Sequence, residues 1–256
     1  MEVWSTFKIP KEFPWVQHTN SKTVMAENIK DIKKQVAEDW QNAFPQLVKY
    51  AQNKYYKILG SVIVGIELIK LPKAEDYRPH FVIYSLWGNK SGKDLKACLS
   101  VPIVLKEFFN RKGLQFSIPY LKHSSDFPEV LKAVKKQLPF SMQGDISLKK
   151  VLSALDEHSK TPPLSAAPNS YLQASLIESK LEIAICSGSE KQVQDIFSQI
   201  KKRSWDLDHF ALWGIKYEEW LKSVENKITN KNELLSRLDT NKQDKKLEKL
   251  QRSELN

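Results

Sequence analysis

The chain has 256 residues, of which 41% are hydrophobic and 27% are charged. This composition excludes the intrinsically disordered classes and predicts a globular protein that folds without metal or disulfides. The first residues lack the apolar segment of a secretion signal, and the most apolar stretch, residues 62–69, is too short for a membrane helix. We therefore expect a cytoplasmic protein without a membrane partner.

The net charge of +10 raises the question of nucleic-acid binding. The excess is spread along the whole chain, and it comes from 35 Lys against only 5 Arg. Arg makes the bidentate contacts that recognise phosphate and guanine, whereas a surplus of Lys more often forms a solvated surface. Frequent Lys, Asn and Ile with little Arg is also typical of an AT-rich genome.

Residues 1–23 combine aromatic side chains with prolines, which predicts an extended arm held to the domain by its aromatic rings. From 26 to 55, apolar residues recur at spacings of three and four, which predicts an amphipathic helix that Pro45 kinks or restarts. Residues 57–71 carry apolar side chains on both faces, as a central strand does, and so do residues 80–87.

Residues 95–105 alternate between apolar and other side chains, and Pro102 favours an edge strand or a bulge there. A hairpin turn is predicted at residues 110–113, with Gly113 in the left-handed conformation, before a strand at 114–120. The pattern thus predicts a four-stranded antiparallel meander. Two amphipathic helices follow, with a capping box at Asp126 and an N-cap at Ser147.

The proline-rich residues 159–170 predict a linker, where we place a domain boundary. Beyond it, the pattern predicts a strand, a helix capped by Ser189 and a second strand, which form a ferredoxin-like β-α-β unit, and then a helix. The charged C-terminal end predicts a frayed tail. The predicted strands span 171–186 and 210–217, the last helix spans 220–228, and the frayed tail spans 241–256.

The predicted fold class is therefore α+β: an antiparallel β-meander flanked by amphipathic helices, followed by a ferredoxin-like β-α-β unit and a C-terminal helical tail. The first predicted unit contains the arm, the first helix, the sheet and the two helices that follow it. The second contains the β-α-β unit and one helix, and it either forms its own domain or joins the first. The boundaries are 1–158 and 171–230, with a charged tail at 231–256.

Glu178 and Lys180 have the E-x-K spacing of metal-dependent nucleases, in which a carboxylate holds the metal and a Lys stabilises the transition state. On the predicted strand both residues share a face with Glu182, which an ordinary half-exposed strand with alternating charges also produces. No second acidic group lies at a suitable spacing. The structural interpretation is therefore favoured, and we expect neither a metal site nor a cofactor.

Three other motifs have residue types that occur in functional sites, but none has the spacing or the partners that such a site requires. Residues 88–94 superficially resemble a phosphate-binding loop, but they have three residues between the glycines and Asp after the Lys. Residues 206–209 contain possible metal ligands and residues 123–126 contain the residue types of a catalytic triad, but neither run has partners of known spacing. Cys98 and Cys186 fall in predicted strands and are expected to be reduced thiols rather than a disulfide.

Five lysines form the densest basic set outside the C-terminal tail, on the solvent faces of the two helices that follow the sheet. They are Lys132, Lys135, Lys136, Lys149 and Lys150. Coplanar faces would let them contact the phosphates of a duplex, although no aromatic residue interleaves to stack on bases. A solvated face is the favoured interpretation.

The chain carries no recognisable catalytic or cofactor motif. We therefore predict a non-enzymatic protein of a bacterial cytosol that binds another protein, as a complex subunit or an inhibitor or immunity-type partner. The alternative is a nucleic-acid-binding accessory protein that uses the five lysines. A metal-dependent nuclease that uses Glu178 and Lys180 ranks third.

Overall fold

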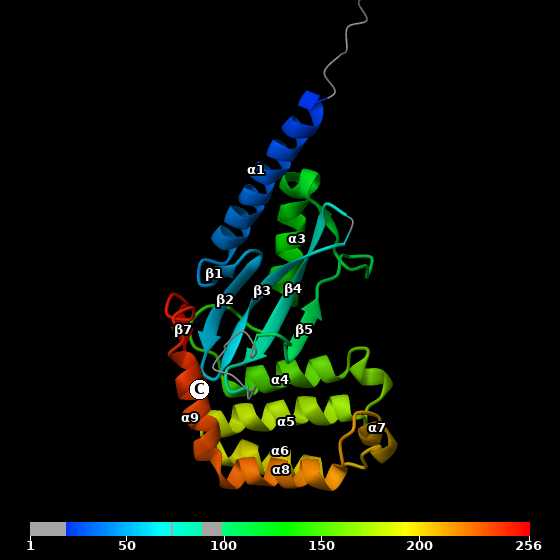
Figure 1. Cartoon of the computed structure of the whole chain (residues 1–256), viewed down its shortest axis with the longest axis vertical. Coiled ribbons are helices and arrows are strands. Elements are labelled where there is room, and N and C mark those ends of the chain that lie inside the picture. Colours follow the sequence, from blue (N-terminus) through cyan, green and yellow to red (C-terminus); the bar gives the residue numbers. More distant parts are fainter. Residues whose placement is uncertain (1–18, 73, 89–98) are drawn as a thin grey trace, which may run out of the picture.

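The computed structural model describes residues 19–72, 74–88 and 99–256, with side chains from residue 29 onward. An antiparallel sheet stands above a layer of stacked helices (Figure 1), so the predicted α+β class is confirmed. The predicted aromatic arm up to residue 18 lies outside the described residues. The same holds for residues 89–98, which include Cys98 and most of the glycine-containing loop.

The sheet contains five strands in sequential order, and each neighbouring pair is antiparallel. The strands are β1 (Val48–Ala51), β2 (Lys54–Leu59), β3 (Val62–Lys70), β4 (Asp76–Ser85) and β5 (Val104–Glu107). The predicted strand at 57–71 is divided by a turn at Gly60, whose φ of +56° suits a residue without a side chain. Beyond β5, the two-residue strand β6 (Ile118–Pro119) pairs with the remaining length of β4.

Helices α1 (Thr19–Ala43) and α3 (His123–Gln137) cover one face of the sheet, and the 3₁₀ turn η1 (Tyr120–Lys122) precedes α3. Trp40 of α1 donates a hydrogen bond to the hydroxyl of Tyr77 in β4 at 3.3 Å, and Tyr55 of β2 donates to the carbonyl of Ala37. The predicted helix over 26–55 is correct only in its first part. It ends before Pro45, because proline disfavours helical backbone in the residue that precedes it.

Six α-helices and one 3₁₀ turn follow α3. They are α4 (Leu148–Ser159), η2 (Leu164–Ala166), α5 (Tyr171–Cys186), α6 (Glu190–Lys202), α7 (Leu207–Leu212), α8 (Tyr217–Thr229) and α9 (Lys231–Lys242). The β-α-β prediction is therefore wrong in both strands, since 171–186 form α5 and 210–217 form the end of α7, a turn and the start of α8. Its central helix is confirmed as α6. Helix α5 is buried on nearly all sides, so it shows no apolar stripe.

The C-terminal residues are folded onto the sheet, which corrects the prediction of a frayed tail. Strand β7 (Arg252–Ser253) pairs in parallel with the end of β2. Leu247 and Leu250 are 0% and 4% exposed, and the Asn256 amide donates to the carbonyl of Ile146 at 3.1 Å. The prediction relied on the charged average composition of this segment, which does not reflect the buried positions of Leu247 and Leu250.

The buried apolar side chains form one cluster that extends from α1 through the sheet to the C-terminal residues. The stretch 159–170 contains η2 and the buried Leu164, and a domain boundary within it stays a prediction. Among the described residues, no helix is long and apolar enough to cross a membrane.

The docking of the C-terminal segment gives a test of stability. Leu247→Ala should lower the free energy of unfolding by about 2–5 kcal/mol, the range for truncating a fully buried leucine. Leu212→Ala is the matched control, because Leu212 is 83% exposed. Urea unfolding of both variants measures the difference. Equal stability of the two would show that residues 244–256 are not docked in solution.

Candidate functional site

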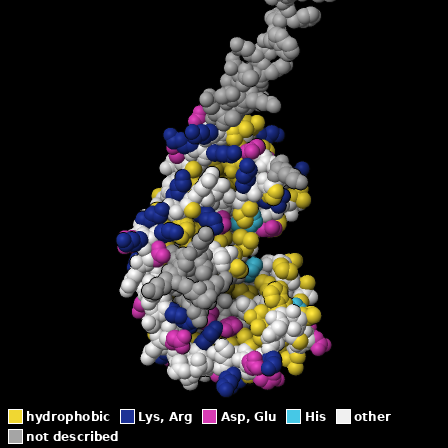
Figure 2. All heavy atoms as spheres, in the orientation of Figure 1, with side chains coloured by type: hydrophobic (Ala, Val, Ile, Leu, Met, Phe, Trp, Pro, Cys, Tyr) yellow, Lys and Arg dark blue, Asp and Glu magenta, His cyan; other side chains and the backbone are white. Residues whose placement is uncertain are grey.

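A cleft of about 1150 Å³ lies between the outer edge of β5 and α4. Figure 2 shows it as a notch in the outline of the molecule, bordered by hydrophobic side chains. Four segments form it: β5 with the residues just after it, the end of α3, most of α4, and the turn after α4. We call it the β5–α4 cleft. Its lining includes Val104–Glu107, Phe109, residues 137–139, Lys149, Lys150, Ala154, Glu157, His158 and residues 161–163.

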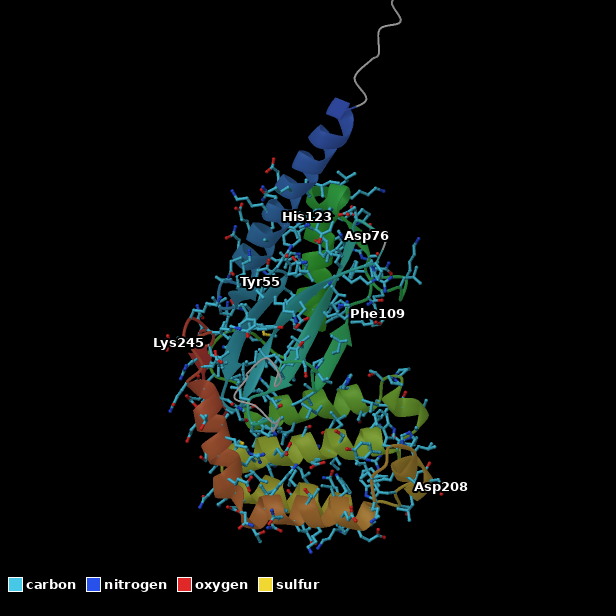
Figure 3. The ribbon with its side chains drawn as sticks, viewed as in Figure 1. Tyr55, Asp76, Phe109, His123, Asp208 and Lys245 are labelled. Carbon is cyan, nitrogen blue, oxygen red and sulfur yellow. The ribbon has the colours of Figure 1, made fainter. Side chains whose placement is uncertain are left out.

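The walls of the β5–α4 cleft are largely apolar. Leu105 and Phe109 are each 41% exposed at its mouth, the half-buried Leu138 and Pro139 lie in the lining, and two exposed prolines of the turn after α4 complete it. Figure 3 places Phe109 at the outer end of β5, above α4. Concave apolar surfaces with a few polar groups are the usual form of binding sites.

None of the described carboxylates forms an ion pair with a lysine of the β5–α4 cleft, although Glu157 in the lining attracts the charge of Lys106. Lys106 donates a hydrogen bond to the carbonyl of Gln137 at 2.6 Å, and burial lowers the pKa of its amine. Lys149 and Lys150 are exposed in the first turn of α4, where the helix dipole favours negative rather than positive charge. The carboxylate of Glu157, by contrast, is 2.7 Å from Lys160.

His158 is the one described titratable group in the lining that could serve as a base near neutral pH. Burial lowers the pKa of its imidazole, so the ring is neutral at that pH. Its Nδ1 lies 3.4 Å from the hydroxyl of Thr161 in the same turn, and the described residues place no carboxylate on the ring. A base without an orienting acid lacks the arrangement that activates a nucleophile. The described residues therefore do not form the nucleophile, base and acid of an acyl-transfer site around His158.

The structure separates the five predicted lysines into two groups. All five side chains are exposed, as predicted. Lys132, Lys135 and Lys136 lie on α3, which runs along the sheet, whereas Lys149 and Lys150 lie on α4, which crosses below the sheet in another direction (Figure 1). Only the second group lines the β5–α4 cleft.

Glu178 and Lys180 lie on a helix instead of the predicted strand, and they point to different partners. The carboxylate of Glu178 accepts a hydrogen bond from Trp220 at 2.7 Å and pairs with Lys227. Lys180 instead reaches Asp156 of α4 at 2.5 Å. The prediction that they share a face is wrong, because residues two apart on a helix project in nearly opposite directions. The described residues contain no group of three His, Cys, Asp or Glu side chains that could hold a metal.

Glu178 belongs to a buried ionic cluster that joins the helical layer to the sheet. Glu182, one turn further along α5, accepts a hydrogen bond from the indole of Trp87 at 2.7 Å, and Lys227 of α8 lies 2.6 Å from its other oxygen. Burial raises the pKa of Glu182, and the attraction of Lys227 opposes that shift. Burial by itself lowers the pKa of Lys227, but the two carboxylates outweigh it and the pKa is raised.

The residues of the other polar motifs have structural partners. His123 is buried between α1 and α3 (Figure 3), with Nε2 2.9 Å from Asp39 and Nδ1 2.7 Å from the hydroxyl of Tyr77. These partners come from distant parts of the chain, and Asp126 takes no part. Asp206 caps α7 by accepting a hydrogen bond from the amide of His209 at 2.9 Å.

The β5–α4 cleft was not predicted from the sequence. One signal was present in Pro102, which suggested an edge strand, and a second in the proline-rich residues 159–170, three of which line the cleft. Neither signal indicated that the two segments meet. In comparisons with family models, curated proteins and solved structures, nothing matches this chain.

The ionic cluster gives a prediction with a defined pH dependence. Lys227→Met leaves two buried carboxylates without a cation and should lower the free energy of unfolding by about 3–5 kcal/mol near pH 7. Burial already raises the pKa of Glu182, and loss of the cation removes the attraction that opposes this rise. The stability of the variant is therefore retained at low pH and lost as the pH rises through the folded-state pKa of Glu182.

The measurement is urea unfolding at about pH 7.5 and about pH 5. The difference in the free energy of unfolding between Lys227→Met and the unchanged protein should be smaller at the lower pH. Lys222→Met is the control, because Lys222 is exposed on the same helix. A loss of unfolding free energy of the same size at both pH values would mean that Lys227 stabilises the fold by its packing and not by its charge.

Proposed function

We propose that this protein is a non-enzymatic binding protein of a bacterial cytosol and that it holds another protein in the β5–α4 cleft. The observation that carries the proposal is the cleft itself: about 1150 Å³, walled by apolar side chains and open along a strand edge. Contiguous exposed apolar surface on a globular protein is typical of an interaction site.

The polar groups of the cleft support binding rather than catalysis. None of its lysines forms an ion pair with a described carboxylate, and its histidine lacks an orienting acid among the described residues. The nuclease hypothesis has less support, since Glu178 and Lys180 each form ion pairs with other residues. A complex subunit and an inhibitor or immunity-type partner both remain within this proposal.

Nucleic-acid binding has weaker support. The five predicted lysines lie on two helices of different direction, and Lys135 lies over the ring of Phe44 at 5.8 Å. Phosphate binding by such a set would be strongly salt-dependent, because each neutralised phosphate releases counterions. This difference lets one experiment separate the two functions.

The test is capture from a native lysate with and without nuclease. The double variant Leu105→Gln with Phe109→Gln removes apolar surface from the mouth of the cleft without adding charge. The control variant, Leu121→Gln with Leu212→Gln, changes two leucines that are 70% and 83% exposed outside the cleft.

We expect the unchanged chain to capture a protein that remains bound after nuclease treatment. The cleft variant should fail to capture it, and the control variant should capture it normally. Replacement of all five lysines by Gln should weaken this capture without abolishing it, because only Lys149 and Lys150 line the cleft. Captured material that disappears with nuclease and with the five-lysine variant would favour nucleic-acid binding instead. Equal loss with the cleft and control variants would show that the cleft is not the site.

A further inference from the structure

The outer edge of β5 has the geometry of an incomplete sheet. Among the described residues, β5 pairs only with β4, and its other side borders the β5–α4 cleft. Natural proteins usually protect such an edge with charge, proline or a covering segment. Here the exposed side chains at the edge include the apolar Leu105 and Phe109.

The side chain of Gln137 shows which backbone groups along the edge of β5 face outward. The amide of Gln137 donates to the carbonyl of Phe109 at 2.7 Å and accepts from its N–H at 3.0 Å. A residue of a neighbouring antiparallel strand makes the same pair of hydrogen bonds. Since backbone direction alternates along a strand, the N–H and carbonyl groups of Glu107 and Leu105 face the same side as those of Phe109.

The surroundings of this edge define what could lie against it. Across the cleft, Ala154, Leu138 and the prolines of the turn after α4 form an apolar wall. Lys106, Lys149 and Lys150 outnumber the carboxylates of Glu107 and Glu157 in the lining, so the cleft carries a net positive charge. An extended segment there would meet backbone groups on one side, apolar side chains on the other, and cations nearby.

We propose that β5 accepts an extended segment of a partner polypeptide as an additional strand, with alternating apolar side chains and at least one carboxylate. The backbone groups of Leu105 and Glu107 supply the pairing, the apolar wall receives every second side chain, and the lysines bind the carboxylate. Such strand addition is a common way to bind peptides, with affinity from the backbone and specificity from the side chains. This inference rests on the proposed binding function and names its mode.

The experiment uses a random twelve-residue peptide library displayed on phage and panned against the full chain. Glu107→Pro removes one outward N–H, and Glu107→Ala retains it while removing the same carboxylate. Peptides enriched on the unchanged protein should bind Glu107→Pro at least about 10-fold more weakly, close to 1.4 kcal/mol. Their affinity for Glu107→Ala should stay within about 3-fold. Circular dichroism and thermal melts check that both variants fold.

A second measurement tests the same hydrogen bonds from the side of the peptide, in case Glu107→Pro fails to fold. N-methylation at successive positions of an enriched peptide should weaken binding at alternate residues only. Replacing an Asp or Glu of the peptide by Asn or Gln should also weaken binding to the unchanged protein. The same replacement should have a smaller effect on binding to a protein variant in which Lys106 and Lys150 are changed to Met.

Several outcomes would overturn the inference. Peptides that require Leu105 and Phe109 but are indifferent to Glu107→Pro and N-methylation would leave the binding function intact and exclude strand addition. If the enriched peptides bind the cleft variant as tightly as the unchanged protein, the β5–α4 cleft is not the binding site. Cleft-dependent binding of a synthetic peptide of residues 1–18, tighter than that of any library peptide, would identify the arm of the chain as the occupant instead.

Discussion

The constraint on which this fold depends is a difference in strand length. Strands β3 and β4 are nine and ten residues long, whereas β1 and β5 have only four each. Buried backbone groups must find hydrogen-bond partners, so the uncovered lengths at both sides of the sheet require other segments. On one side β7 pairs with the end of β2 that β1 does not reach, and on the other β6 pairs with the end of β4 beyond β5. The β5–α4 cleft lies on that second side.

The buried ionic cluster solves a related problem in the helical layer. Glu178 and Glu182 lie one turn apart on a helix surrounded by other elements, and each accepts a hydrogen bond from a tryptophan indole. Lys227 lies between the two carboxylates. Two desolvated carboxylates contribute little net stability even with a cation. Their value lies in geometry, because only one placement of α8 on α5 and of α5 against the end of β4 satisfies all three charges.

The sequence predicted the parts of the fold that have periodic signals. The meander, the helices after the sheet and the edge position near Pro102 followed from alternation, amphipathic spacing and turn residues. Helix α5 failed because a helix buried on nearly all sides has no polar stripe, and its Leu and Ile residues matched a strand equally well. Its length of 16 residues was the available clue, since strands of that length are uncommon. The frayed tail failed because an average over charged residues concealed Leu247 and Leu250.

The candidate site could not be predicted, for a different reason. Exposure of the five lysines followed from their helical positions, but the β5–α4 cleft is formed by segments far apart in the chain. Leu105 indicated only a half-exposed strand, and residues 161–163 indicated only a linker. Their proximity depends on where the helical layer docks, and no local pattern encodes that.

The pairing of β7 with β2 also has a consequence for biosynthesis. The sheet begins to assemble from residues made early, when Ile58 and Leu59 can pair with β3, but their neighbours on the other side are Arg252 and Ser253. A nascent chain on the ribosome therefore carries an open strand edge at this end of β2 until residues 252–253 have been translated. Such non-local pairing slows folding and leaves the unfinished sheet susceptible to aggregation. Chaperone binding during translation would have its greatest effect on this protein at that stage.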